Sequence, residues 1–245
     1  MKSPDKLYRF HVENLRAVQV GLDKVLAAGR RSIALRQASA VPTYLRLYAF
    51  MVGAWAECRL LKLLYEPAAF SDAERQTIRD ETALVRWVKV VETAFRRHYL
   101  IPAATLQPPA LPKTAHVRLQ VLTSVIQDDL RWIITLRNKL AHGQWAYPLT
   151  DDLEDIAQEQ MDALRTENLL SLKQKASLIE WLCASIHDLV VSLPTFNRDF
   201  DRHFARIEQT RRNLATKDYA RWVSQIKTKH DRGQADFRQR IKASG

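Results

Sequence analysis

Residues 136–143, which read Leu-Arg-Asn-Lys-Leu-Ala-His-Gly, bring together side chains that can move a proton and hold an anion. Histidine can accept or release a proton at physiological pH, so His142 is the proton-transfer candidate. Arg137 stays charged, and a buried arginine must find an anion, an aromatic ring or a water-filled cleft. Gly143 is suited to the position just after a helix, so we expect the helix to end at about His142.

These residues close a long amphipathic run that begins near residue 114. At 100° per residue, several apolar side chains of the run fall within an arc of about 80°. They are Leu122, Ile126, Leu130, Ile133 and Leu140. Arg137 falls inside the same arc, whereas His142 lies about 140° away from it. The run predicts one long helix over residues 114–142, with an arginine in its buried stripe.

A purely structural role is the alternative for this motif. Arg137 would then form a buried salt bridge with Asp128, Asp129 or a carboxylate of another helix. Asn138 and His142 would serve as capping residues at the helix C-terminus.

Arg137 is followed directly by Asn138, and His142 is followed directly by Gly143. This string resembles the motif of the HEPN superfamily. Members are small all-α domains, and many are metal-independent ribonucleases. The resemblance covers the motif and the helix that carries it. The same bare spacing recurs at Arg198 and His203, where we expect a solvated face first and RNA contact second.

The resemblance implies cleavage of RNA by attack of a 2′-hydroxyl on the neighbouring phosphate, which leaves a 2′,3′-cyclic phosphate and a 5′-hydroxyl. His142 would be the general acid or base, and Arg137 would hold the phosphate. Asn138 would orient the imidazole or a phosphate oxygen, and Lys139 would add positive potential. A homodimer whose two motifs line one cleft is implied, as is a toxin or anti-phage defence role with an antitoxin or sensor protein as partner.

The charge balance also points to an anionic partner. The 245 residues carry a net charge of +11 with a pI near 9.8, which favours nucleic acid, and RNA in particular given the resemblance. A solvated basic surface is the alternative. Seven of these net charges come from the segment after residue 195, where the candidate RNA-binding side chains are Arg198, Arg202, Arg211, Arg212, Lys227 and Lys229.

Several function classes are disfavoured. Cys58 and Cys183 lie in apolar helical runs, so we expect buried thiols in a reducing, cytoplasmic compartment. No Cys/His spacing suits a metal, and we expect no metal and no cofactor. The sequence lacks a glycine-rich phosphate loop and a nucleophile elbow, which argues against an NTPase or a serine hydrolase. No apolar run is long enough to span a bilayer, and the N-terminus lacks a signal-peptide pattern.

The whole pattern predicts an all-α fold, a bundle of long antiparallel helices with additional C-terminal helices, since no sustained two-residue alternation occurs. We expect a HEPN-like bundle over residues 1–194 and a basic helical extension over 195–245 packed on the same domain. The predicted helices cover residues 5–29, 30–38, 42–66, 71–99 with a possible break at 80–82, 114–142, a segment starting at Thr150, 168–191, 196–213 and 217–230, followed by a frayed tail. Gly53, Ala54 and Ala56 would let another helix approach closely.

Two hypotheses follow: a dimeric HEPN-type endoribonuclease, or a non-catalytic module of the same type that binds nucleic acid or a protein partner. The first expects Arg137 and His142 to border an open, positive cleft. The second expects both side chains to be held in internal hydrogen bonds.

Overall fold

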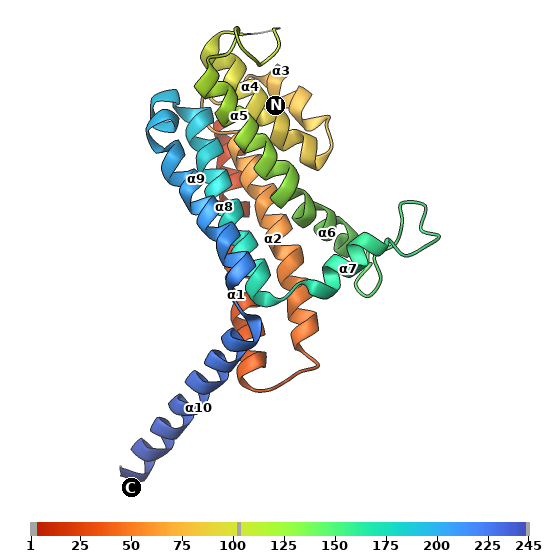
Figure 1. Ribbon diagram of the computed structural model, residues 1–245, viewed down its shortest axis with the longest axis vertical. Coiled ribbons are helices and arrows are strands. Elements are labelled where there is room, and N and C mark those ends of the chain that lie inside the picture. Colours follow the sequence, from red (N-terminus) through yellow and green to blue (C-terminus); the bar gives the residue numbers. More distant parts are fainter. Residues whose placement is uncertain (1–3, 102–103, 244–245) are drawn as a thin grey trace.

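A computed structural model describes residues 4–101 and 104–243, and its regular elements are helical throughout (Figure 1). They are α1 (Pro4–Ala34), α2 (Val41–Leu64), α3 (Asp72–Arg79), α4 (Ala83–Tyr99), α5 (Lys113–Val125), the π-helical turn η1 (Ile126–Leu130), α6 (Arg131–Ala141), α7 (Gln158–Thr166), α8 (Leu169–Val191), α9 (Leu193–Thr216) and α10 (Tyr219–Ala243). The predicted all-α class is confirmed. None of the helices in the described ranges is long and apolar enough to cross a lipid bilayer.

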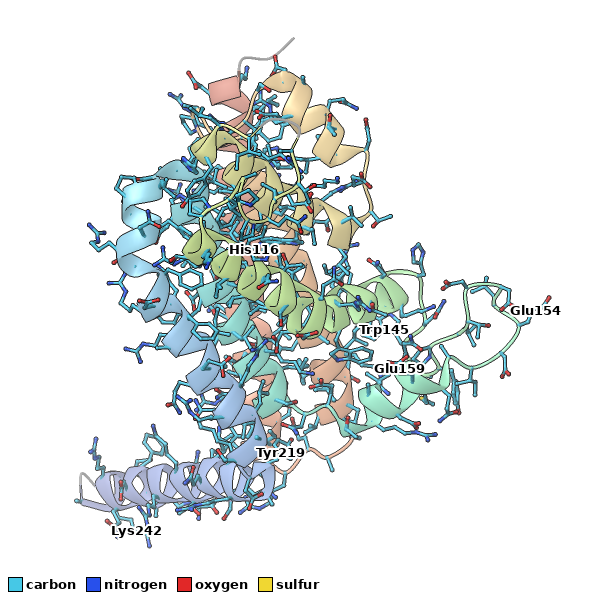
Figure 2. All side chains as sticks on the ribbon, turned by 45° about the horizontal axis from the view of Figure 1, so that its top comes forward. His116, Trp145, Glu154, Glu159, Tyr219 and Lys242 are labelled. Carbon is cyan, nitrogen blue, oxygen red and sulfur yellow. The ribbon has the colours of Figure 1, made fainter. Side chains whose placement is uncertain are left out.

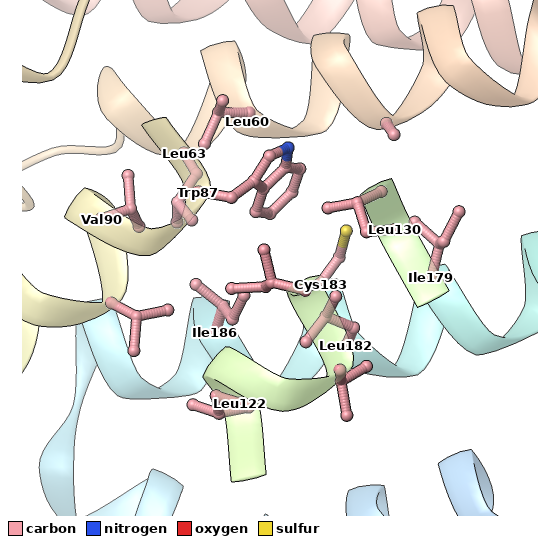
Figure 3. Packing of buried hydrophobic residues seen from close by; sticks show 14 of the residues in the cluster. Leu60, Leu63, Trp87, Val90, Leu122, Leu130, Ile179, Leu182, Cys183 and Ile186 are labelled. Carbon is pink, nitrogen blue, oxygen red and sulfur yellow. The ribbon is translucent and has the colours of Figure 1, made fainter. Parts of the chain in front are cut away.

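The core lies around α2, which packs against α1, α6 and α8. The run from α5 through η1 to α6 crosses α2 diagonally, and α9 lies along α8 (Figure 1). Trp87 of α4 is a large, fully buried side chain at the centre. It lies among Leu60 of α2, Leu130 of η1 and Cys183 of α8 (Figure 3). The boundary expected at residue 194 falls in the first turn of α9.

Local capping explains where several helices begin. Ser71 and Glu74 form the expected capping box: the Ser71 side chain accepts from the Glu74 amide at 3.2 Å, and the Glu74 carboxylate accepts from the Ser71 amide at 2.7 Å. The helix it starts ends at Arg79, so the break expected near residues 80–82 is present. Asn168 caps α8 in the same way, with its side chain accepting from the amides of Leu170 and Ser171.

The predicted stop at Gly29, and the separate short helix after it, are wrong, because α1 runs unbroken to Ala34. Gly29 instead serves a close helix contact. A Cβ atom there would lie 2.8 Å from Leu169 Cδ1 and 3.2 Å from Tyr44 Cβ. A glycine in a helical pattern can end the helix or admit a neighbour, and the sequence alone does not separate the two uses.

The predicted helix start at Thr150 is also wrong, because α7 begins only at Gln158. Thr150 and Asp152, which suggested a helix cap, instead form hydrogen bonds within the loop. The Thr150 hydroxyl donates to the Asp152 carboxylate, which also accepts from the Glu154 amide at 3.2 Å. The Thr150 amide donates to the Asp155 carbonyl at 2.8 Å. Such local bonds offer the backbone an alternative to helix.

The C-terminal region is more helical than expected. α9 begins at Leu193 with Ser192 as its cap, rather than at residues 194–195. The frayed tail predicted after residue 230 is wrong, because α10 continues to Ala243. Its first turns pack on α1, and Arg36 Nη2 binds Asp231 Oδ2 at 2.7 Å. Beyond that ion pair, α10 projects away from the bundle (Figures 1 and 2).

Both cysteines are free thiols, as predicted, and Cys183 is buried while Cys58 is half-buried. Burial raises the pKa of the Cys183 thiol to about 12, and it also raises the pKa of Cys58. At pH 8 the thiolate fraction of Cys183 is then roughly a thousandfold below that of an exposed thiol. We expect iodoacetamide to alkylate Cys183 in the native protein only as fast as the protein unfolds, as measured by intact mass. In denaturant both thiols should react within minutes, and rapid labelling of native Cys183 would contradict its burial.

Candidate functional site

The π turn sets the direction of the motif side chains. η1 adds a residue to one helical turn, so every residue after it is rotated relative to an uninterrupted α-helix. Ile133, Leu136 and Leu140 form the buried stripe of α6. Arg137 lies at the edge of that stripe with a half-buried side chain. The prediction of Arg137 inside the stripe is therefore wrong, and Leu136 takes the buried position.

Arg137 faces α2 and is held there by two partners. Its Nη2 forms an ion pair with Glu57 Oε2, and its Nη1 donates to Asn138 Oδ1 at 3.0 Å. Its Nε is buried and has no hydrogen-bond partner among the described residues. The Arg137 side chain as a whole remains 29% exposed. The acid partner comes from another helix, as one structural alternative anticipated, and neither Asp128 nor Asp129 fills this role.

Gly53 brings α2 and α6 together beside this ion pair. A Cβ atom at Gly53 would lie 2.4 Å from Arg137 Cβ and 2.7 Å from Arg137 Cγ. The prediction that small residues here admit a neighbouring helix is confirmed. A small cavity of about 20 Å³ lies next to the pair, and its lining includes Glu57, Arg86, Trp87 and Arg137. That volume holds about one water molecule.

His142 ends α6 with its side chain exposed to solvent. Gly143 follows with φ +80°, as expected for a glycine after a helix. The Gln144 amide donates to the Lys139 carbonyl at 3.0 Å, and the Gly143 amide donates to the Leu140 carbonyl at 3.2 Å. This closing motif turns the chain away and leaves the imidazole without a hydrogen-bond partner in the described structure.

The two supporting side chains act differently from what the sequence suggested. The Asn138 side chain accepts from Arg137 and makes no bond to the imidazole of His142 among the described residues, so it orients the guanidinium; the Asn138 carbonyl accepts only from the His142 backbone amide, at 3.1 Å. Lys139 Nζ donates to the Leu149 carbonyl at 2.6 Å and to Asp151 Oδ1 at 3.1 Å. Lys139 therefore fastens the loop between α6 and α7 to the end of the motif helix.

The structure sorts the candidate RNA-binding side chains into paired and unpaired groups. Arg198 and Arg202 both bind Asp199, at 2.8 and 3.4 Å, and Arg211 binds Asp129 and Glu208. Arg212 donates to Gln209 at 3.1 Å. Lys227 and Lys229 of α10 have no ion-pair partner in the described part of the chain. His203, expected on a solvated face, is buried and bound to Asp188 at 2.9 Å, so that expectation is wrong.

Sequence reasoning did not single out Glu57, which pairs with Arg137 from another helix. A weak signal existed, since Glu57 lies one helical turn after Gly53, at the point where close approach was expected. Among the described residues, no group of three or more His, Cys, Asp or Glu side chains is placed to hold a metal ion. No protein-family model, curated protein or solved structure matches this chain.

Proposed function

We propose that the protein is a metal-independent endoribonuclease of the HEPN type that acts as a homodimer. The observation that carries the proposal is the end of α6, where an exposed His142, whose imidazole has no partner among the described residues, follows a partly exposed Arg137 in a strongly basic chain. Resemblance to the superfamily supplies the reaction. A cytoplasmic role in defence or as a toxin, under control of an antitoxin or sensor protein, follows from the same resemblance.

The chemistry needs one proton transfer on each side of the phosphorus. A base removes the proton of the 2′-hydroxyl, the 2′-oxygen attacks phosphorus, and the bond to the 5′-oxygen breaks as that oxygen takes up a proton. His142 performs one of these transfers. Arg137 stabilises the added negative charge on the phosphoryl oxygens, and Glu57 and Asn138 fix the orientation of its guanidinium.

A second protomer completes the proposed cleft. Arg137 is directed toward α2, whereas His142 lies on the solvent side of the helix end, and no hydrogen bond joins them in the described structure. Two facing copies would let each arginine meet the other copy's histidine. The loop after the motif supports such a contact, because its apolar side chains Tyr147, Leu153 and Ile156 are exposed.

One observation favours the second candidate, a non-catalytic binding module of the same type. Arg137 is already paired internally, and the cavity beside it is too small for a phosphate group. In the endoribonuclease, phosphate must therefore approach the guanidinium from its solvent side, because Glu57 and Asn138 already bind one N–H group each.

Cleavage of total RNA by purified protein in EDTA tests the proposal. We expect cleavage that persists with the chelator and leaves cyclic phosphate and 5′-hydroxyl ends, read by their resistance or susceptibility to end-labelling enzymes. The Arg137→Ala and His142→Ala proteins, purified in the same way, control for contaminating nucleases. Binding of RNA without cleavage would favour the non-catalytic module, and cleavage retained by both variants would overturn the proposed site.

A further inference from the structure

A groove of about 390 Å³ lies where α8 meets the turn between α9 and α10. Its basic side chains are Lys173 of α8, Lys217 of the turn and Arg221 of α10. Trp222 forms part of the wall, and it also packs on the core and on Tyr219. The groove is far from the beginning of the chain, at the end of the bundle from which α10 projects (Figures 1 and 2).

The groove carries three cations and one carboxylate, so its net charge is positive, and its cations form no ion pair in the described structure, unlike Arg198, Arg202 and Arg211 of α9. The side chains of Lys173, Lys217 and Arg221 are exposed and form no ion pair or hydrogen bond in the described structure. The acid in the lining, Asp218, uses its carboxylate to accept from the Ala220 amide at 2.8 Å. Basic side chains left unpaired in one groove create a positive potential that suits a polyanion.

A second observation points to a ligand with hydrogen-bonding edges. Gln174 lines the groove, is only 8% exposed, and has no hydrogen-bond partner for its side-chain amide among the described residues. The residue is packed on its other sides, but its amide atoms keep access to the groove, so water or a ligand there can bond to them. The amide can donate to and accept from a nucleobase or a ribose hydroxyl in the groove.

The polar face of α10 extends the groove along the helix. Arg221 and Gln225 line both the groove and a neighbouring depression on α10. The lining of that depression also includes Thr228, Lys229 and Arg232. Arginine, lysine, hydroxyl and amide side chains in a row are the groups that contact a phosphate backbone. The apolar stripe of α10, which contains Ile226 and Phe237, faces another direction by the 100° rule.

We propose that this groove and the polar face of α10 bind single-stranded RNA and hold it for the α6 site. The ligand is taken from the proposed function. The groove has room for about one unpaired nucleotide, and its aromatic wall and the Gln174 amide can contact the edge and face only of a base that is not paired. An A-form duplex would present only its backbone to the cations.

The test measures binding of a fluorescent 2′-O-methyl oligouridine, which cannot be cleaved, by anisotropy at several salt concentrations. A triple variant, Lys173→Gln/Lys217→Gln/Arg221→Gln, should bind at least tenfold more weakly at low salt. The slope of log Kd against log salt should fall by about 2, since each phosphate contact on a single strand contributes about 0.7. Gln174→Leu should weaken binding severalfold and leave the slope unchanged, because the amide is uncharged.

The matched control removes equal charge at the opposite end of the bundle, with Lys6→Gln/Arg9→Gln/Lys113→Gln, where all three side chains are exposed. It should bind within about threefold of wild type, as expected for loss of long-range potential alone. If both triple variants weaken oligouridine binding equally, the groove is not the binding site, and the RNA is attracted by the overall charge of the protein. Equal affinity for an RNA duplex or for anionic lipid vesicles would overturn the assignment to single-stranded RNA.

The outcome is separable from the nuclease proposal. If oligouridine binding depends on the groove and the wild type cleaves no RNA, the groove is an RNA-binding site and the endoribonuclease proposal is rejected. If cleavage depends on His142 but the groove variant binds and cleaves RNA normally, the endoribonuclease proposal is supported and the groove is rejected as an RNA-binding site.

Discussion

The Arg137→Ala and His142→Ala proteins are each expected to lose RNA cleavage by roughly 10²- to 10⁴-fold, and mixing the two is expected to restore about a quarter of the wild-type rate. The losses follow from removing the proton-transfer group or the cation that stabilises the phosphorane charge. The recovery follows from the directions of the two side chains, since Arg137 is held toward Glu57 while His142 leaves the helix end into solvent.

In the proposed dimer, the shared cleft contains two catalytic pairs, and each pair takes Arg137 from one protomer and His142 from the other. A mixed dimer then has one pair with both substitutions and one pair with neither. Random subunit exchange makes about half of the dimers mixed, and each has one of its two pairs intact. The measurement is the initial cleavage rate after the two variants are mixed, exchanged in mild denaturant and returned to native buffer.

Arg131→Ala is the control for this experiment. Arg131 begins α6, is exposed and bonds to Gln127 one turn earlier, so its loss should leave cleavage near the wild-type rate. Both inactive variants must elute as folded dimers. No recovery on mixing would mean that the arginine and histidine act within one protomer, and a monomeric wild type would reject the shared cleft.

Much of the fold could be predicted because its signals are local. The capping box at Ser71 and Glu74 and the glycine after His142 each depend on residues within one turn. The apolar spacing of residues 122–140 likewise predicted a helix and most of its buried side. Such patterns act through short-range sterics and hydrogen bonds, so they can be recognised without knowledge of the partners.

The features that determine the candidate site are non-local. Glu57 and Arg137 are 80 residues apart, and only the packing of α2 on α6 makes them partners. The π turn at residues 126–130 rotates the whole of α6 relative to α5, and no residue type in the sequence predicts such a turn. Gly29 illustrates the same limit, because its role depends on Leu169, a residue from a distant helix.

Gly53→Ala is expected to lower the free energy of unfolding by about 2–3 kcal/mol, a large cost for adding one methyl group. In most helix interiors this substitution stabilises, since alanine has a higher helix propensity than glycine by about 1 kcal/mol. At Gly53 the new Cβ would lie 2.4 Å from Arg137 Cβ, and the Ile133 carbonyl is 3.3 Å away. Neither group is the tip of a flexible side chain, so α2 and α6 must move apart.

Gly21→Ala in α1 is the matched control, because its new Cβ would meet only the Cε tip of Met51, at 2.7 Å, which can rotate away. We expect its thermal midpoint to change little, whereas Gly53→Ala should lose roughly 5–10 °C in a protein of this size. Separation of the helices would also pull Arg137 from Glu57, so RNA cleavage by the folded Gly53→Ala protein should fall. A Gly53→Ala protein as stable as the Gly21→Ala protein would show that α2 and α6 do not pack this closely, and it would remove the contact that positions Arg137.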